Sequence, residues 1–273
     1  MIRDLRIAVI GAGVMCEAMI GGLLKKQLIA ADQVIATEPR AERRAELQAR
    51  FPGLRAVEDN IEAARWAQVV LFAVKPQTLP KVLPELRGAL GTGDLAISIV
   101  AGAPLRVFAE GLEHPAVVRS MPNTPAQIGE GMTVWAASPA VSEQQRGWAK
   151  TILGAAGHEM MVDDESYLDM STAINGTGPA YIFMMLEAMI DAGVHMGLPR
   201  YMAEELVHQT MLGSVRYAIQ TGTHAAQLRN AVTSPGGTTA AAMYELEKGG
   251  LRTVLTDAIW AAYRRSVELG KPK

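Results

Sequence analysis

The amino-terminal stretch LRIAVIGAGVMCEAMIGGLLKK, residues 5–26, decides the fold. Residues 5–10 form a short apolar run typical of a buried parallel strand, and residues 17–26 have the composition of a helix. Between them, Gly11-Ala12-Gly13-Val14-Met15-Cys16 matches the dinucleotide fingerprint at its first two glycines and has a small residue, Cys16, at the third position. The stretch therefore predicts a strand, a glycine turn and a helix that bind a nucleotide.

Further apolar runs continue the pattern of an open parallel sheet, at residues 33–37, 69–74, 95–100 and 117–120. In doubly wound sheets the ligand lies across the carboxyl ends of the strands. We therefore expect residues 73–76 and 100–102 to border the nicotinamide half of a bound dinucleotide. Lys75 and Asn123 are candidate site residues on the same grounds, although a surface lysine and a turn asparagine would leave the same pattern.

The residues after the second predicted strand give opposite indications about the cofactor. Glu38 could accept a hydrogen bond from a free ribose 2′-hydroxyl group, which favours NAD. Arg40, with Arg43 and Arg44 one turn further on, could neutralise a 2′-phosphate, which favours NADP. A charge-rich helix start explains the same residues without a ligand. Since three arginines outweigh one glutamate in charge, we predict that NADPH is used at least as well as NADH, with Arg40 as the main phosphate contact.

The spacing of apolar residues changes at about residue 164, where strand patterns end and apolar residues begin to recur at helical spacing. Helices are expected over residues 180–196, 202–220 and 251–269. We therefore predict an α/β fold of two domains, a Rossmann-type dinucleotide-binding domain over residues 1–163 and an all-α dimerisation and substrate-binding domain over residues 164–273.

The first of these helices carries Met184, Met185 and Met189 and has almost no polar face. A small helical domain cannot bury such a helix by itself. A stripe of methionines is more often core than cofactor site, so we expect this helix to be buried against a partner subunit.

A second glycine turn, residues 233–242, reads TSPGGTTAAA. Ser234 and Pro235 favour an extended or turn conformation, the two glycines permit unusual backbone angles, and the threonines lead into an alanine-rich helix. Unpaired N–H groups, the hydroxyl groups of Ser234, Thr238 and Thr239, and the positive end of the helix dipole would together hold a carboxylate. A well-capped loop without a ligand explains the same residues.

Composition excludes several classes of protein. The chain has 273 residues, of which 49% are hydrophobic and 20% charged, so it can bury a sizeable core. A formal net charge of −2 gives no general attraction for nucleic acid or anionic lipid. The absence of a signal peptide and of a membrane-spanning apolar stretch, with a single cysteine, predicts a cytoplasmic protein. The five histidines have no metal-ligand spacing, and no metal site is predicted.

Five motifs together resemble the pyrroline-5-carboxylate reductase family, and the resemblance covers essentially the whole chain. The most specific is the turn at residues 234–239 with its continuation to residue 243. The other four are Gly11-Ala12-Gly13, Ala73-Val74-Lys75-Pro76, Met121-Pro122-Asn123-Thr124-Pro125 and Gly176-Thr177-Gly178-Pro179-Ala180-Tyr181. The resemblance implies the final step of proline biosynthesis, in which NADPH or NADH reduces the cyclic imine L-1-pyrroline-5-carboxylate to L-proline. It also implies a helical domain that intertwines with a second subunit, often in rings of five dimers.

The resemblance implies roles for individual residues as well. The positions that hold the substrate carboxylate and approach its ring nitrogen are Ser234, Gly237, Thr238 and Thr239, of which Thr239 is the catalytic candidate. From the sequence pattern and the resemblance together, the cofactor positions are Gly11, Ala12, Gly13, Val14, Met15, Cys16, Glu38, Arg40, Asn60, Ala73, Val74, Lys75, Pro76, Val100, Ala101 and Gly102. Cys16 and Glu38 depart from the family pattern, because many members have glycine or alanine at the first position and a small residue at the second.

The implied reaction needs little general acid–base catalysis from the protein. A protonated imine already carries the charge that attracts hydride, so the protein must chiefly place the nicotinamide against the imine carbon and anchor the carboxylate. Thr239 is expected to hydrogen-bond the ring nitrogen. Two alternatives are a β-hydroxyacid dehydrogenase, which needs a catalytic lysine although none occurs between residues 151 and 247, and a nucleotide-sensing scaffold without turnover.

Overall fold

A computed structural model describes residues 2–271 of the chain. The strands are β1 (Ile7–Ile10), β2 (Val34–Thr37), β3 (Arg55–Val57), β4 (Val69–Phe72), β5 (Leu95–Ser98), β6 (Val117–Met121), β7 (Gly131–Ala137) and β8 (Gly157–Met161). The α-helices are α1 (Val14–Lys25), α2 (Ala41–Arg50), α3 (Asn60–Trp66), α4 (Leu79–Glu85), α5 (Leu105–Leu112), α6 (Glu143–Leu153), α7 (Tyr167–Ser171), α8 (Gly178–His195), α9 (Arg200–Thr221), α10 (Ala225–Ala231), α11 (Thr238–Lys248) and α12 (Leu251–Leu269). Three 3₁₀ turns, η1 (Ala31–Gln33), η2 (Thr124–Ile128) and η3 (Gly154–Ala156), and one π-helical turn, η4 (Thr172–Gly176), complete the elements.

The strands form one eight-stranded sheet in the order β3-β2-β1-β4-β5-β6-β7-β8. From β3 to β6 all neighbours are parallel, whereas β7 runs antiparallel to β6 and β8 is parallel to β7. The first six strands thus have the order of a doubly wound dinucleotide-binding fold. The predicted fold class is confirmed, and each of the five predicted strands is present. β3, β7 and β8 are not among the predicted strands.

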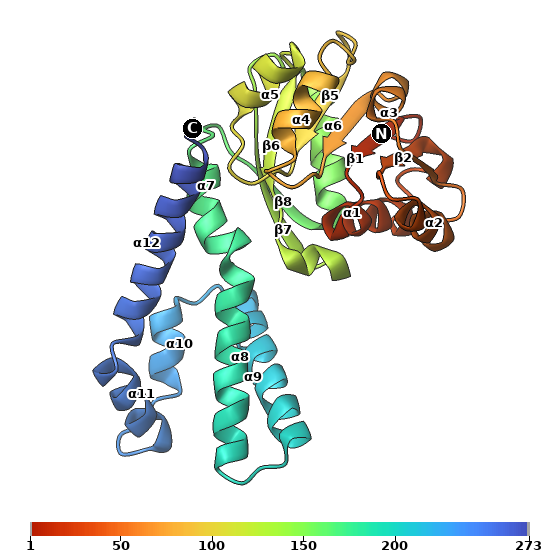
Figure 1. Cartoon of the computed structure of the whole chain (residues 1–273). Helices are drawn as coiled ribbons and strands as arrows, with labels where there is room; N and C mark the ends of the chain where they lie inside the picture. The colour runs from red at the N-terminus through yellow and green to blue at the C-terminus, as the bar shows by residue number, and fades with distance from the viewer. Residues whose placement is uncertain (1, 272–273) are drawn as a thin grey trace. The chain divides into compact units, whose positions relative to one another are not determined.

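Side chains alternate between the two faces of the sheet, and each face has its own apolar core. On β1, Ile7 and Val9 pack with Met19 of α1 on one face, and Ile10 packs with Phe108 of α5 on the other. Helices therefore cover both faces of the sheet, as Figure 1 shows for its yellow-to-red part. Burial on both sides explains why β1, β4 and β5 are continuous apolar runs and not alternating ones.

Packing divides the chain into two units. One unit runs to Thr177 and includes the chain again from Ala262, and the other is Gly178–Ala261. The predicted domains, 1–163 and 164–273, divide the chain by element type, whereas these units divide it by contact. As a result α7, η4 and the last turns of α12 pack with the sheet.

In the unit Gly178–Ala261, α8 and α9 pack against each other, and Figure 1 draws them as neighbouring helices. Their shared core contains Ile190, Ala203 and Val207. Other large apolar side chains of α8 have no cover in the single chain, since Phe183 is 59% exposed and Met184 71% exposed. This exposure agrees with the predicted burial of the helix against a partner subunit. Within residues 2–271, no helix is both long and apolar enough to cross a membrane.

Candidate active site

The turn between β1 and α1 can be made only with glycine at its first position. Gly11 has φ +99°, and a Cβ there would lie 2.9 Å from Cγ1 of Val74 and 3.1 Å from the carbonyl group of Ala73. The Gly11 N–H donates to Oγ1 of Thr37 at 3.3 Å, which ties the turn to β2. The predicted reason for the first glycine, a tight turn, is therefore present in the structure.

The second glycine faces open space. Gly13 is the residue before α1, no side chain caps the helix, and a Cβ built on Gly13 meets no atom within 4 Å. The first N–H groups of a helix have no acceptor inside it, so they can donate to an anion that approaches this point. The turn therefore fits a pyrophosphate, which needs free donors and unobstructed backbone.

Cys16 lies behind this surface. Its side chain is fully buried in the core between α1 and the sheet. Burial raises the pKa of the Cys16 thiol to about 12, with a smaller opposing effect from Arg43. The thiol therefore stays protonated at neutral pH, and Cys16 can serve a ligand only through its backbone N–H.

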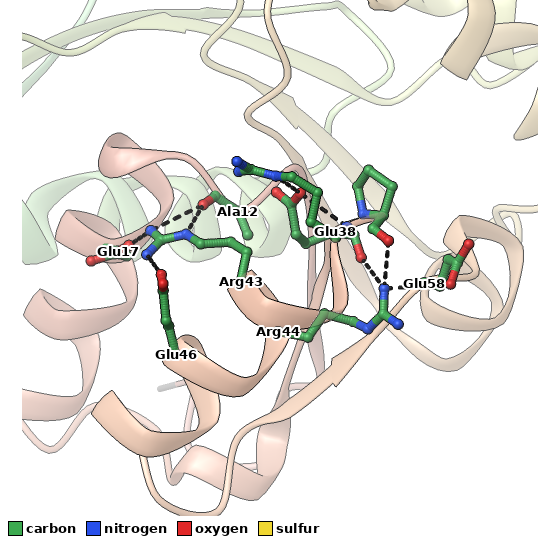
Figure 2. A network of polar contacts seen from close by, with 9 residues as sticks. Ala12, Glu17, Glu38, Arg43, Arg44, Glu46 and Glu58 are labelled. Carbon is green, nitrogen blue, oxygen red and sulfur yellow. Dashed lines mark hydrogen bonds and ion pairs between the residues drawn. The ribbon is translucent and has the colours of Figure 1, made fainter.

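The three arginines near the end of β2 have very different surroundings (Figure 2). Arg44 donates from Nη1 to the carbonyl oxygens of Glu38 and Pro39, both at 2.8 Å, and lies 3.4 Å from Glu58. Arg44 is therefore committed to the turn that follows β2.

Arg43 is committed to the glycine turn. It forms ion pairs with Glu17 and with Glu46, and its guanidinium donates to the carbonyl oxygen of Ala12 at 3.4 Å (Figure 2). Glu17 is buried and also pairs with Arg50. The prediction of NADPH use compared the charges of three arginines with that of Glu38 alone. Glu17 and Glu46 also neutralise Arg43, so that comparison left out two negative charges.

Arg40 is the most exposed of the three, with 70% of its side chain accessible. Its Nε donates to Oε1 of Glu38 at 2.8 Å, and its backbone N–H donates to the same oxygen at 3.2 Å. The Glu38 side chain is only 10% exposed. Glu38 and Arg40, which give opposite indications about the cofactor, thus form an ion pair with each other. Glu38 must leave this pair to bind a ribose hydroxyl group, and Arg40 must leave it to bind a 2′-phosphate.

The other predicted cofactor positions lie at the carboxyl edge of the sheet. Register aligns Ile10, Phe72 and Ser98 at the ends of β1, β4 and β5, so the loops 73–76 and 100–102 begin side by side with the glycine turn. Lys75 is exposed. Asn60 begins α3, where its Nδ2 donates to Glu85 at 3.0 Å. The structure therefore gathers the glycine turn and these two loops along one edge.

Asn123 has a structural role in the chain as it stands. Its Oδ1 accepts from the N–H of Met132 at 2.8 Å, and its Nδ2 donates to Oδ1 of Asn175 at 2.8 Å. Asn175, on η4, donates in turn to the carbonyl oxygens of Met121 and Met132. Asn175 is not among the predicted site residues, and its only signal in the sequence is its place beside the motif that begins at Gly176.

The second glycine turn belongs to the other unit, Gly178–Ala261. Gly236 has φ +70°, Gly237 precedes α11, and no side chain caps that helix. Ser234 and Thr238 are exposed and Thr239 is half-buried. Within the described part of the chain, none of these three hydroxyl groups has a hydrogen bond. No side chain caps α11, so within the described residues the turn is held by backbone hydrogen bonds such as that from the Gly237 N–H to the carbonyl oxygen of Ser234.

The part of the chain that the structure describes contains no cluster of metal-binding side chains. No group of three or more His, Cys, Asp or Glu side chains within residues 2–271 could hold a metal ion.

Comparisons with known proteins agree over the whole chain. A family model described as pyrroline-5-carboxylate reductase dimerisation matches residues 165–269, and one described as NADP oxidoreductase, coenzyme F420-dependent, matches residues 6–102. The pyrroline-5-carboxylate reductase of Synechocystis is 44% identical over 98% of this chain and 99% of its own, and that of Pseudomonas aeruginosa is 42% identical over 97% of each.

Solved structures give the same result. The pyrroline carboxylate reductase of Plasmodium falciparum, with NADP bound, has a TM-score of 0.90 at 30% identity and covers 98% of this chain and 99% of its own. That of Coxiella burnetii has a TM-score of 0.90 at 35% identity over 98% of this chain and 99% of its own. The chain therefore belongs to the pyrroline-5-carboxylate reductase family, NAD(P)H-dependent oxidoreductases that reduce L-1-pyrroline-5-carboxylate to L-proline in the final step of proline biosynthesis.

Proposed function

We propose that this chain reduces L-1-pyrroline-5-carboxylate to L-proline with NAD(P)H, and that the substrate carboxylate binds at the start of α11. The observation that carries the proposal is that this helix start has no side-chain cap and is preceded by a turn rich in hydroxyl groups. Free N–H donors and the helix dipole both favour a bound anion at such a point.

In this proposal Ser234, Gly237 and Thr238 hold the carboxylate, and Thr239 hydrogen-bonds the ring nitrogen. The cofactor, when bound, supplies hydride to the imine carbon, and the nitrogen keeps its proton as it becomes an amine. Because no proton has to be moved during this step, the residues need only orient the imine and exclude water. This explains a site built from hydroxyl and N–H groups.

For the cofactor we propose that the glycine turn, residues 11–16, holds the pyrophosphate and that residues 73–76 and 100–102 border the nicotinamide. Glu38, Arg40 and Asn60 would lie at the adenosine end. The side chain of Arg40 is 70% exposed, against 24% for Arg43 and 21% for Arg44, so of the three it can most easily exchange its partner Glu38 for a 2′-phosphate, which supports use of NADPH at least as well as NADH.

The decisive experiment incubates the purified chain with NADPH and L-1-pyrroline-5-carboxylate and follows the absorbance of the reduced cofactor. Loss of absorbance with formation of proline is the expected result. A nucleotide-sensing scaffold would bind NADPH without consuming it, and a β-hydroxyacid dehydrogenase would act on hydroxy acids instead. Either result would reject the proposed reaction.

The assembly is a homo-oligomer through the helical domain, in keeping with the dimerisation family model. We propose a homodimer, assembled further into a ring of five dimers, in which the glycine turn of one subunit faces Thr239 of another. The uncovered side chains of Phe183 and Met184 support burial between subunits. Sedimentation measurements test the decamer directly.

The shared site predicts complementation between two variants of low activity. Gly11→Ala and Thr239→Val chains, mixed under conditions that allow subunit exchange, should regain part of the activity because each heterodimer contains one intact site and one doubly altered site. No activity in verified heterodimers would reject a site shared between subunits.

We further propose a cytoplasmic location, and functional domains at residues 1–163 and 164–273. Cell fractionation with an antibody to the chain tests the location. Activity confined to a membrane or extracellular fraction would contradict it.

A further inference from the structure

The end of α12 lies against the loop that follows β5. Gly102 has φ +68°, and a Cβ built on it would lie 2.9 Å from Cβ of Leu269 and 3.3 Å from the Leu269 carbonyl oxygen. A Cβ on Gly270 would lie 3.7 Å from Cγ of Pro104. The last turn of α12 and residues 102–104 are therefore in van der Waals contact. This is the loop proposed to border the nicotinamide.

A chain of hydrogen bonds reaches the same loop from its other end. Arg119 of β6, with only 6% of its side chain exposed, pairs with Glu165 at 2.9 Å and with Asp169 of α7 at 3.2 Å. Glu165 also accepts from the N–H of Leu105, the first residue of α5, at 2.8 Å. The start of α5 is thus fixed by a carboxylate that a buried arginine holds in place.

The same network holds the end of α12. Oγ of Ser266 donates to Oδ1 of Asp169 at 2.7 Å, and the Ser266 side chain is buried. Figure 1 shows the dark-blue end of α12 beside α7, in agreement with this bond. Ser266 is therefore connected, through Asp169, Arg119 and Glu165, to the residue that ends the loop after β5.

The loop is consequently fixed at both ends and along its side. At its beginning the N–H of Val100 donates to Oγ of Ser98 at 3.1 Å, and at its end Leu105 is bound by Glu165. Leu269 packs on Gly102 between these points. A buried arginine paired with two carboxylates permits few other arrangements, because an unpaired charge there would be costly.

We propose that Ser266 and Leu269, at the end of α12, are positioning residues for the cofactor, which act by holding residues 100–104 in the conformation that receives the nicotinamide half. The proposal rests on the proposed assignment of residues 100–102 to the cofactor. It gives the end of α12 a part in cofactor affinity although its residues belong to the predicted dimerisation domain.

The first test is Ser266→Ala. The dissociation constant of NADPH, measured by fluorescence titration, should rise about threefold to tenfold, which is less than the full effect of losing a hydrogen bond to a charged group because Ser266 acts on the cofactor only through the loop. The KM for NADPH should rise with it, while kcat and the KM for L-1-pyrroline-5-carboxylate stay near wild type. Glu268→Gln is the matched control, because it removes an exposed ion pair with Arg265 on the same helix end and should leave NADPH binding unchanged.

The second test addresses the packing contact. Leu269→Ala keeps the Cβ that touches Gly102, whereas Leu269→Gly removes it, and glycine is tolerated at the end of a helix. The glycine variant should weaken NADPH binding more than the alanine variant does.

A purely structural role predicts a different pattern. If Ser266→Ala lowers Tm or the fraction of active protein while NADPH binds as in wild type, the proposal is overturned. If the wild-type chain binds NADPH without reducing L-1-pyrroline-5-carboxylate, the proposed function fails, whereas weaker NADPH binding by Ser266→Ala would still support the positioning role. A wild-type chain that does not bind NADPH would overturn both.

Discussion

The two glycine turns of this chain each lead into a helix start that can bind an anion, but they present different groups to it. Each ends in a helix start without a side-chain cap, at α1 and at α11. The first turn begins against the sheet, with Gly11 next to Val74 and Cys16 in the core, and at Gly13 it presents backbone to open space. The second is accessible and presents the hydroxyl groups of Ser234 and Thr238.

The first turn would therefore bind its ligand through close approach of the backbone, and the second through individual hydroxyl donors. A turn that presents backbone fails when any added atom prevents close approach, because its donors cannot be removed one at a time. A turn that presents hydroxyl groups loses one hydrogen bond for each substitution, and its effects are graded. Substitutions that close the first turn should therefore have larger effects than the loss of single hydroxyl groups in the second.

The largest effect is expected for Gly11→Ala. The added Cβ would lie 2.9 Å from Val74 at a backbone angle, φ +99°, that alanine avoids, so the turn must move. We expect kcat/KM for NADPH to fall by roughly a hundredfold or more, the equivalent of about 3 kcal/mol. NADPH titration and steady-state kinetics measure the change.

Gly13→Ala is the matched comparison, because its Cβ meets no protein atom within 4 Å and its φ of −77° suits alanine. It should fold as wild type does and still bind NADPH weakly, since the methyl group stands where the pyrophosphate approaches. Unchanged NADPH affinity in Gly13→Ala would show that this turn does not hold the cofactor.

The next largest effect is expected for Thr239→Val, which removes the hydroxyl group with little change in shape. If the hydroxyl bonds the ring nitrogen as imine becomes amine, kcat should fall roughly tenfold to a hundredfold. Thermal melts should change little, because no side chain caps α11. A folded variant with wild-type kcat and KM would rule out this role.

A smaller effect of a different kind is expected for Ser234→Ala. The substrate carboxylate keeps its charge throughout the reaction, so a bond to it contributes uniform binding. KM for L-1-pyrroline-5-carboxylate should rise about threefold to tenfold while kcat stays near wild type. A fall in kcat with constant KM would move Ser234 from carboxylate binding to the reacting atoms.

The sequence was most informative where local pattern and burial agree. The runs at β1, β4 and β5 are buried on both faces, so they are apolar without interruption and easily identified. β8 could not be found in this way, because its end is exposed, with Met160 at 53% and Met161 at 37%. β3 has only three residues at the edge of the sheet.

The candidate site, too, could be predicted only where its residues form a local sequence pattern. The glycine turns have local signals, and both lie where they are expected in the chain. Two partners of the arginines have no such signal, because Glu17 and Glu58 belong to other elements than Arg43 and Arg44, whereas Glu38 and Glu46 are local partners. The bond between Ser266 and Asp169 spans 97 residues and has no local pattern at all.

The smallest effect is expected for Arg40→Ala, at the proposed adenosine end of the cofactor site. Arg40 is exposed, so its contact with a 2′-phosphate competes with water and with Glu38. We expect kcat/KM for NADPH to fall only about twofold to fivefold, with that for NADH unchanged. The ratio of the two specificity constants is therefore the quantity to measure.

Arg43→Ala separates this role from a structural one. Arg43 contacts Ala12 of the glycine turn and the buried Glu17, so its loss should disturb the pyrophosphate site and lower kcat/KM for both cofactors together. Arg40→Ala should instead change the preference between them. If Arg40→Ala lowers both constants equally, Arg40 does not bind the 2′-phosphate, and Glu38, freed from its ion pair, becomes the residue that sets cofactor choice through the ribose hydroxyl group.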